Sequence, residues 1–375
     1  MKRLLGTLML CFLSAVACSG EKRSPSDRVH DEISGVTENT GHFVINPQFD
    51  EASSFADGLA AVRIGDDSTG KYGFIDKQGK IVINPQFDYY NSGFADGLAA
   101  VRIGDDKAEG IAGKWGFIDK QGTIVINPQF DYAGQFADGL AVERIGDDST
   151  GKYGFIDKQG KIVINPQFNW AYPFTDGLAA VRIGSDKTSK HGFIDKQGKI
   201  VINPQFSWAY PFTDGLALVE IGSEDGFIDK QGKLVIINPQ FDEVGQFADG
   251  LAAVQIGDKY GFIDKQGKMV IKPQFDGAGS FTDGLAAVRI GDDKTGKWGL
   301  IDKQGTIVIN PQFDRVDQFA DGLAAVRIGD WETGKWGFID KQGKMVINPQ
   351  FVYAGQFTDG LALVRIGGKI GFISR

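Results

Sequence analysis

A unit of 34 to 43 residues recurs nine times along this 375-residue chain, and this repeat restricts the fold more than any other feature of the sequence. Each copy carries the tripeptide Pro-Gln-Phe, whose prolines stand at positions 47, 85, 128, 166, 204, 239, 273, 311 and 349. A single unit of this size cannot bury its apolar face alone, so neighbouring units must stack. The sequence therefore predicts one continuous repeat array.

Each copy contains three short apolar runs that are typical of β-strands. In the first complete copy they are Leu59–Ile64, Lys71–Asp76 and residues 80–84. They are rich in Val, Ile, Phe and Tyr and are bounded by turn residues. The turn at residues 76–79 predicts a hairpin between the second and third runs. Pro85 lacks an N–H group and is expected to end the third strand. These patterns predict an all-β array of nine three-stranded units.

The phenylalanines indicate where the core of this array lies. All but Phe12 and Phe43 of the 28 phenylalanines occupy three fixed positions of the repeat. Burying each ring stabilises the fold by roughly 1.5–3 kcal/mol. We therefore expect these rings to form a core between stacked units.

The two ends of the array are complementary. It begins with a lone third strand at residues 43–46 and ends with a first and a second strand, Leu361–Ile366 and residues 370–373. Pairing of the terminal strands in one sheet would give a propeller-like closed ring without exposed edges. An open β superhelix with truncated end units fits the same pattern. The sequence leaves both architectures open.

The second run of each unit, as in KWGFIDKQGK, resembles the WG (or KWG) repeat family of bacterial proteins. The resemblance covers residues 41–375. The pair is Trp-Gly at 115, 298 and 336, Tyr-Gly at 72, 153 and 260, and is degraded at His191, Asp225 and Ile370. The resemblance implies an all-β repeat array with a binding role. It implies no reaction, no catalytic residue and no cofactor.

Residues 1–17 have the pattern of a signal peptide. Lys2 and Arg3 precede an apolar stretch that is too short to span a membrane. The stretch ends in Ala-Val-Ala-Cys, which resembles a bacterial lipoprotein box and implies that Cys18 is lipidated. Cleavage before Cys18 would leave it as the only cysteine, which excludes a disulfide within the chain.

These features predict an envelope protein whose membrane contact is an N-terminal lipid anchor. Ser19 after the cysteine permits sorting to the outer membrane by analogy with other lipoproteins. The expected organisation is a signal peptide at 1–17, a lipid-anchored flexible tether at 18–41 and the WG-repeat β array at 42–375.

The charge of the chain argues against nucleic acid as a partner. The formal net charge is −8, and loss of the two basic residues of the signal peptide makes it −10. The charges are spread through loops without a basic stripe, so the sequence predicts neither nucleic-acid nor anionic-lipid binding.

Neither a metal site nor a catalytic site is predicted. The aspartate-rich loops lack the alternating oxygen-ligand spacing of calcium loops, and no histidine has a second ligand at metal-binding spacing. The three histidines are His30, His42 and His191. We therefore expect a non-enzymatic envelope protein that presents its repeat surface to a protein or glycan partner. The alternative is an envelope enzyme with a site in the central channel or groove of the array.

The candidate binding residues are aromatic and lie between Pro-Gln-Phe and the next Asp-Gly pair. Exposed rings there could stack on sugars or hold side chains of a partner. The other interpretation is that they pack between units. The candidates are Tyr89, Tyr90, Trp170, Tyr172, Trp208 and Tyr210.

Glu143 breaks the pattern of the first strand, where other units have Val at the same place, as at Val62, Val101 and Val181. Because an unpaired buried charge is costly, we expect a local strand shift that exposes the carboxylate.

Overall fold

The computed structural model describes residues 41–65, 69–104, 113–185, 188–237 and 241–375. The chain divides between Glu38 and Asn39. The expected signal peptide and, apart from Gly41, the expected tether lie outside the described residues. Within the described part, no helix has the length and apolar character required to cross a membrane.

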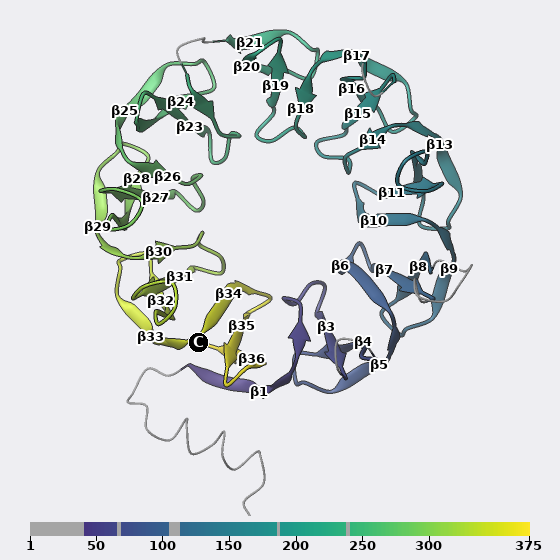
Figure 1. The fold of residues 1–375 in the computed structure, drawn as a ribbon, viewed down its shortest axis with the longest axis horizontal. Helices are drawn as coiled ribbons and strands as arrows, with labels where there is room; N and C mark the ends of the chain where they lie inside the picture. The colour runs from purple at the N-terminus through teal and green to yellow at the C-terminus, as the bar shows by residue number, and fades with distance from the viewer. Residues whose placement is uncertain (1–40, 66–68, 105–112, 186–187, 238–240) are drawn as a thin grey trace, which may run out of the picture. The chain divides into compact units, whose positions relative to one another are not determined.

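In the described residues, thirty-six strands form nine antiparallel sheets of four strands each. The sheets stand as blades around a ring (Figure 1), which makes residues 41–375 a nine-bladed β-propeller. Blades are numbered 1 to 9 in chain order, beginning with β2–β5. Of the two architectures that the sequence left open, the structure has the ring.

Four strands follow one another from the channel outward in each blade. The innermost strands are β2 (Glu51–Ala52), β6 (Tyr89–Ala95), β10 (Tyr132–Ala137), β14 (Trp170–Ala171), β18 (Trp208–Ala209), β22 (Glu243–Val244), β26 (Gly277–Ala278), β30 (Arg315–Val316) and β34 (Tyr353–Thr358). The second strands are β3 (Leu59–Ile64), β7 (Leu98–Ile103), β11 (Leu140–Ile145), β15 (Ala179–Ile183), β19 (Ala217–Ile221), β23 (Leu251–Ile256), β27 (Leu285–Ile290), β31 (Leu323–Ile328) and β35 (Leu361–Ile366).

The third and outermost strands complete each blade. The third strands are β4 (Lys71–Asp76), β8 (Lys114–Asp119), β12 (Lys152–Ile156), β16 (Lys190–Ile194), β20 (Glu224–Ile228), β24 (Lys259–Asp264), β28 (Lys297–Asp302), β32 (Lys335–Asp340) and β36 (Lys369–Ser374). The outermost strands are β5 (Ile81–Phe87), β9 (Ile124–Phe130), β13 (Ile162–Phe168), β17 (Ile200–Phe206), β21 (Leu234–Ile237), β25 (Met269–Phe275), β29 (Ile307–Phe313), β33 (Met345–Phe351) and β1 (His42–Phe49).

The prediction of three strands per unit was wrong, because each blade has a fourth, innermost strand. That strand comes from the connector after Pro-Gln-Phe and has only two residues in six blades, as in β2. It pairs with a neighbour on one side alone, through contacts such as Ala52 with Val62. A two-residue strand leaves no alternating pattern in the sequence, and this explains the omission.

The N-terminal strand closes the ring. β1 is the outermost strand of blade 9 and pairs with β36, with Phe43 opposite Ile373 and Phe49 opposite Ile370. Figure 1 shows the purple β1 beside the yellow strands of the C-terminus. The terminal blade therefore has four strands like the others, and no third strand lacks its neighbour.

Proline continues the outermost strand instead of ending it, so the prediction for Pro85 was also wrong. β5 runs through Pro85 to Phe87. The outer edge of an edge strand makes no ladder bonds, and proline is tolerated there. At this point a Cβ on Gly73 would lie 2.4 Å from the Ile83 carbonyl oxygen and 2.6 Å from the Pro85 nitrogen. This close backbone approach requires the glycine of the Tyr72-Gly73 pair, which corresponds to Trp-Gly in other blades.

The hydrophobic core lies between blades, as the phenylalanines predicted. Phe74 of blade 1 is fully buried and packs against Phe94 of blade 2, with ring centres 5.0 Å apart. Equivalent contacts join the other blades, except that Leu300 faces Phe319 between blades 7 and 8. Each blade therefore depends on both neighbours for its burial.

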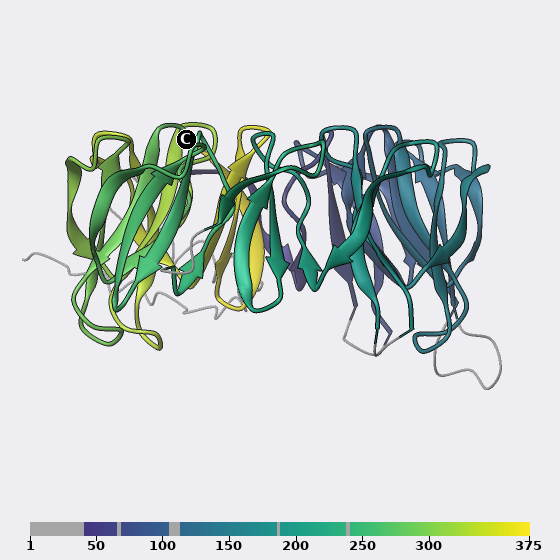
Figure 2. The same cartoon turned by 90° about the horizontal axis from the view of Figure 1, so that it is seen from above.

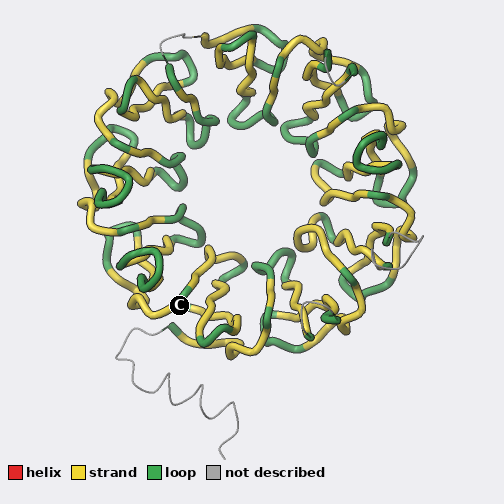
Figure 3. Tube along the Cα trace, viewed as in Figure 1, coloured by secondary structure: helices red, strands yellow, loops and turns green. Residues whose placement is uncertain are grey.

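The two faces of the ring carry different connections. The turn face carries the Asp-Gly turn between the first two strands and the Asp-Lys-Gln-Gly turn between the last two. The loop face carries the loops of variable length between the second and third strands and the connectors between blades. Figure 2 shows the strands running between these faces, and Figure 3 marks the loops and turns in green.

Candidate functional site

The acidic residues shared by the repeats hold the turn face together. Asp76 Oδ1 accepts hydrogen bonds from the N–H groups of Gln78 and Lys80, at 3.0 and 2.9 Å. Asp57 Oδ2 accepts one from Gly97 of the next blade at 3.0 Å, and Lys120 lies 3.8 Å from the same oxygen. These carboxylates therefore serve turns and blade contacts, and the hairpin that the sequence predicted at residues 76–79 is present.

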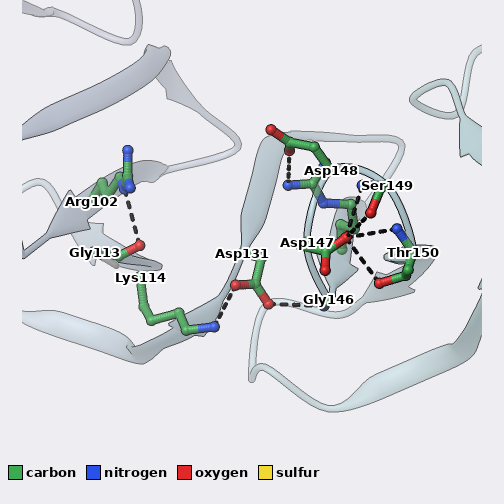
Figure 4. A network of polar contacts seen from close by, with 10 residues as sticks. Arg102, Gly113, Lys114, Asp131, Gly146, Asp147, Asp148, Ser149 and Thr150 are labelled. Atoms are coloured by element: carbon green, nitrogen blue, oxygen red, sulfur yellow. Dashed lines mark hydrogen bonds and ion pairs between the residues drawn. The ribbon is translucent and has the colours of Figure 1, made fainter. Parts of the chain in front are cut away.

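A second set of shared contacts joins the blades at the loop face. Lys114 donates a hydrogen bond of 2.5 Å to Asp131, whose other oxygen accepts the N–H of Gly146 at 2.9 Å (Figure 4). Burial alone would raise the pKa of Asp131, but the bonds from Lys114 and Gly146 outweigh it and lower that pKa. The same arrangement recurs at Asp88, Asp276 and Asp314.

The aspartate-rich loop of blade 3 is closed by its own hydrogen bonds. Asp147 Oδ1 accepts four of them, from the backbone and hydroxyl groups of Ser149 and Thr150, at 2.7–2.9 Å (Figure 4). These bonds, the Ser149 hydroxyl first, lower the pKa of Asp147. No group of three His, Cys, Asp or Glu side chains suited to a metal occurs among the described residues.

One row next to the loop face combines residues that differ between blades with the phenylalanine of Pro-Gln-Phe, which every blade has. In blade 1 this row is Glu51, Arg63, Tyr72 and Phe87, which pair in register across the four strands. Residues that pair directly lie on the same side of a sheet, and Tyr72 and Phe87 pack against blade 2. We call this row and its equivalents the loop-face tier.

The innermost member of the tier changes most along the ring. In chain order it is Glu51, Tyr89, Tyr132, Trp170, Trp208, Glu243, Gly277, Arg315 and Tyr353. Four consecutive blades, 2 to 5, thus begin with an aromatic residue. We call Tyr89, Tyr132, Trp170 and Trp208 the aromatic arc.

The candidates of blades 4 and 5 are partly exposed and partly packed between blades. Trp170 is 42% and Trp208 38% exposed. One side of Trp170 packs on Tyr153 of the preceding blade, with ring centres 5.1 Å apart, and Trp208 packs similarly on His191 at 5.0 Å. Each ring therefore packs between blades on one side, as one interpretation predicted, and is exposed on the other, while partner binding by the exposed side stays a prediction.

The tyrosines beside these tryptophans extend the aromatic surface. Tyr172 and Tyr210 each lie edge-on to the tryptophan of their own blade, with ring centres 6.2 Å apart. Tyr210 is 38% exposed, whereas Tyr172 is half-buried. Two adjacent blades therefore present an indole and a phenol each.

The two candidates of blade 2 differ from each other. Tyr89 is exposed, and the Arg102 guanidinium lies 5.5 Å from its ring centre. Tyr90 packs between Tyr72 and Phe74 of blade 1, and burial raises its pKa. Tyr89 therefore belongs to the aromatic arc, while Tyr90 contributes to the core between blades.

Glu143 is buried, so the strand shift expected from the sequence was wrong. β11 keeps a regular register, with Glu143 opposite Gly154 and Arg144 opposite Tyr153. The Glu143 side chain is 0% exposed, and neither carboxylate oxygen has a hydrogen-bond partner in the described residues. Burial raises the pKa of Glu143 to about 7. A shift by one residue would turn every side chain of β11 to the opposite side of the sheet.

Sequence reasoning missed a cavity between blades 7 and 8. It has a volume of about 370 Å³, and its walls include Trp298, Arg327 and Trp331. The connector of blade 7 contributes the small residues Gly279 and Ser280, where blades 4 and 5 have Tyr and Pro. The sequence alone did not indicate this cavity, because the connectors of blades 1, 6 and 8 lack aromatic residues as well.

Comparison with known proteins identifies the repeat. A model of the WG containing repeat matches nine segments, residues 38–66, 72–106, 115–147, 153–185, 192–224, 226–260, 260–294, 298–330 and 336–369. No curated protein matches the chain.

Solved structures share the fold at low sequence identity. A eukaryotic initiation factor is 10% identical with a TM-score of 0.58, and the match covers 91% of this chain and 94% of that one. The tricorn protease is 13% identical with a TM-score of 0.27, covering 85% and 37%. Acylaminoacyl peptidase from Pyrococcus horikoshii is 10% identical with a TM-score of 0.37, covering 74% and 57%. The first likeness shows the fold alone, whereas the nine repeat matches span most of the chain, which therefore belongs to the family of WG-repeat proteins.

Proposed function

We propose that this protein is a non-enzymatic binding or scaffold protein of the bacterial cell envelope. It presents the loop face of its propeller to a protein or glycan partner. The N-terminal segment that resembles a lipoprotein signal supports an anchor on Cys18 in the outer membrane. The dispersed negative charge favours neither nucleic acid nor a lipid surface as the partner.

The observation that carries this proposal is the exposed part of the aromatic arc. Tyr89, Trp170 and Trp208 keep 38–51% of their surface accessible although each is fixed from behind by a neighbouring side chain. A ring that is already held in place loses little conformational freedom when a partner covers it. Tyrosine and tryptophan in such positions are the residues that most often dominate binding energy.

The double variant Trp170→Ala, Trp208→Ala tests the proposal. Loss of the two exposed indole rings should weaken the free energy of partner binding by about 2 kcal/mol or more while changing the melting temperature little. The measurement combines pull-down from envelope extract with thermal unfolding. Tyr353→Ala is the matched binding control, because Tyr353 has the same tier position in blade 9, is 49% exposed and lies outside the arc.

Trp336→Ala provides the reference for a structural tryptophan. Trp336 is 7% exposed, and its truncation should cost about 3–5 kcal/mol of stability. If the double variant of blades 4 and 5 melts as early as Trp336→Ala, the arc is part of the core and the binding proposal fails. Undiminished capture by a stable double variant would also contradict it.

A further inference from the structure

The loop of blade 8 departs from its counterparts at one residue. In blades 3 and 7 the arginine of the loop-face tier pairs with an aspartate four residues later, as Arg144 with Asp148 at 2.5 Å and Arg289 with Asp293. The loop after Arg327 aligns with the loops after Arg144 and Arg289, but Trp331 occupies the position of Asp148 and Asp293. Blade 8 has therefore lost the carboxylate that neutralises this arginine.

Arg327 consequently keeps a guanidinium group that faces Asp314 and Asp330 without forming an ion pair with either. Burial alone would raise the pKa of Asp314, but the hydrogen bonds that both carboxylates accept lower the pKa of each, and the charge of Arg327 contributes to this. Within the described residues it has no ion pair, and its buried Nε has no hydrogen-bond partner. Its guanidinium carbon lies 5.2 Å from the centre of the Trp331 ring. The indole ring of Trp331 attracts the cation but supplies no hydrogen-bond acceptor. The guanidinium N–H groups of Arg327 can therefore donate hydrogen bonds to a ligand.

Space for a ligand exists beside this arginine. Two cavities of about 370 and 350 Å³ share the residues Trp298, Asp314, Arg327 and Trp331 in their walls. Each volume lies in the range of small-ligand pockets. We call these cavities together the blade 7–8 groove, between β26–β29 and β30–β33 in Figure 1.

The groove combines two cations that make no ion pair within the described residues, Arg327 and Lys294, with a flat apolar surface and several hydrogen-bond acceptors. Trp331 is 77% exposed and offers a free indole face. A guanidinium fork matches a carboxylate in geometry and charge. Asp314, Asp317 and Asp330 also line the groove and can accept hydrogen bonds from hydroxyl groups.

We propose that the blade 7–8 groove binds a sugar ring that carries a single carboxylate, as a hexuronic acid does. The carboxylate pairs with Arg327, and the apolar face of the ring lies against Trp331. Arg289 and Arg315 also line the groove, but each is already paired with an aspartate, so they are not available to further negative charges of a polyanion such as an acidic peptide. This balance favours a ligand with few negative charges and many hydroxyl groups.

This inference does not rest on the aromatic arc, because the groove is built from different blades. The test uses the purified full-length protein with methyl glucuronide and methyl glucoside as probes. These sugars differ only in the carboxylate, and isothermal titration calorimetry measures both affinities. The parent protein should bind the acidic sugar at least tenfold more tightly than the neutral one.

Trp331→Asp is the decisive variant because it restores the residue that blades 3 and 7 have at this place. The new carboxylate should pair with Arg327 and weaken binding of methyl glucuronide at least tenfold. Arg327→Gln should abolish the preference for the acidic sugar. Arg144→Gln is the matched control, since Arg144 is already paired with Asp148, and should leave binding unchanged.

Several outcomes would overturn the proposal. They are no measurable binding of methyl glucuronide by the parent protein, equal binding of the two sugars, or full binding by Trp331→Asp. An aspartate-rich peptide that binds more tightly than the sugar, and loses binding in Trp331→Asp, would assign the groove to a different ligand class. Loss of sugar binding in Trp170→Ala, Trp208→Ala would place the site in the aromatic arc instead.

Discussion

Replacing Glu143 by Val should stabilise the protein, and the gain should grow with pH. Glu143 is fully buried without a partner, whereas the equivalent residues Val101 and Val181 are buried and apolar in blades 2 and 4. The second and third strands pair in the same register in blades 2, 3 and 4. Glu143→Val therefore gives blade 3 the same buried side chain as blades 2 and 4.

The size of the effect follows from the pKa of this carboxyl group. Burial raises that pKa from 4.5 to about 7 in the folded protein. Below pH 4.5 the group is protonated in both the folded and the unfolded state, so it adds no pH dependence. As the pH rises toward 7 the unfolded state ionises first, and stability falls. Above pH 7 the accumulated loss is about 3 kcal/mol, at 1.36 kcal/mol for each unit of pKa difference.

Urea unfolding of the parent and Glu143→Val between pH 4.5 and 8.5 measures this directly. All other titrating groups are common to both proteins, so the difference in free energy of unfolding isolates Glu143. That difference should increase by about 3 kcal/mol across the range. Glu143→Gln, which keeps the shape but cannot ionise, should remove the same pH dependence. A difference that stays flat with pH, or a valine variant less stable than the parent at pH 8, would refute the reasoning.

Two further predictions concern the repeat and the anchor. Gly299→Ala should cost about 1–3 kcal/mol of stability in thermal or urea unfolding, because the new Cβ would lie 2.4 Å from the Ile309 carbonyl oxygen. Gly226→Ala should cost less, since its nearest atom is 3.0 Å away, and equal costs would contradict the close-approach argument. Cys18→Ser should leave an unprocessed precursor without fatty-acid label, and persistent labelling would disprove the lipid anchor.

Much of the fold was predictable because the outer three strands of a blade have strong local patterns. Runs such as Leu59–Ile64 and the turn around Asp76 specify strands and hairpins from neighbouring residues alone. The innermost strand was not predictable, because its two residues are held by one neighbouring strand and need no preferred side chain. The prediction that Pro85 ends its strand was wrong for a related reason, since the effect of a proline depends on whether its strand is central or at an edge.

The candidate site was predictable only in part. The sequence indicated where aromatic residues concentrate, but the exposed side of each ring depends on the blade before it, as for Trp170 on Tyr153. Glu143 was misjudged because the register of a whole strand outweighs one buried carboxyl group, which can stay protonated. Trp331 was overlooked although alignment of the loops places it where other blades have aspartate.

The distribution of polar contacts explains why recognition should concentrate on one face of the ring. On the turn face, carboxylates such as Asp57 already accept bonds from the next blade and lie beside its lysine, so a ligand would compete with contacts that hold blades together. On the loop face the same residue types also hold blades together, but the tier beside them changes from blade to blade. A change in the tier or in the loop beside it, such as the tryptophan at position 331 where blades 3 and 7 have aspartate, alters the exposed side chains without removing a contact between blades. The repeat can therefore keep its architecture while the surface of individual blades changes, and this is where we expect differences in binding to arise.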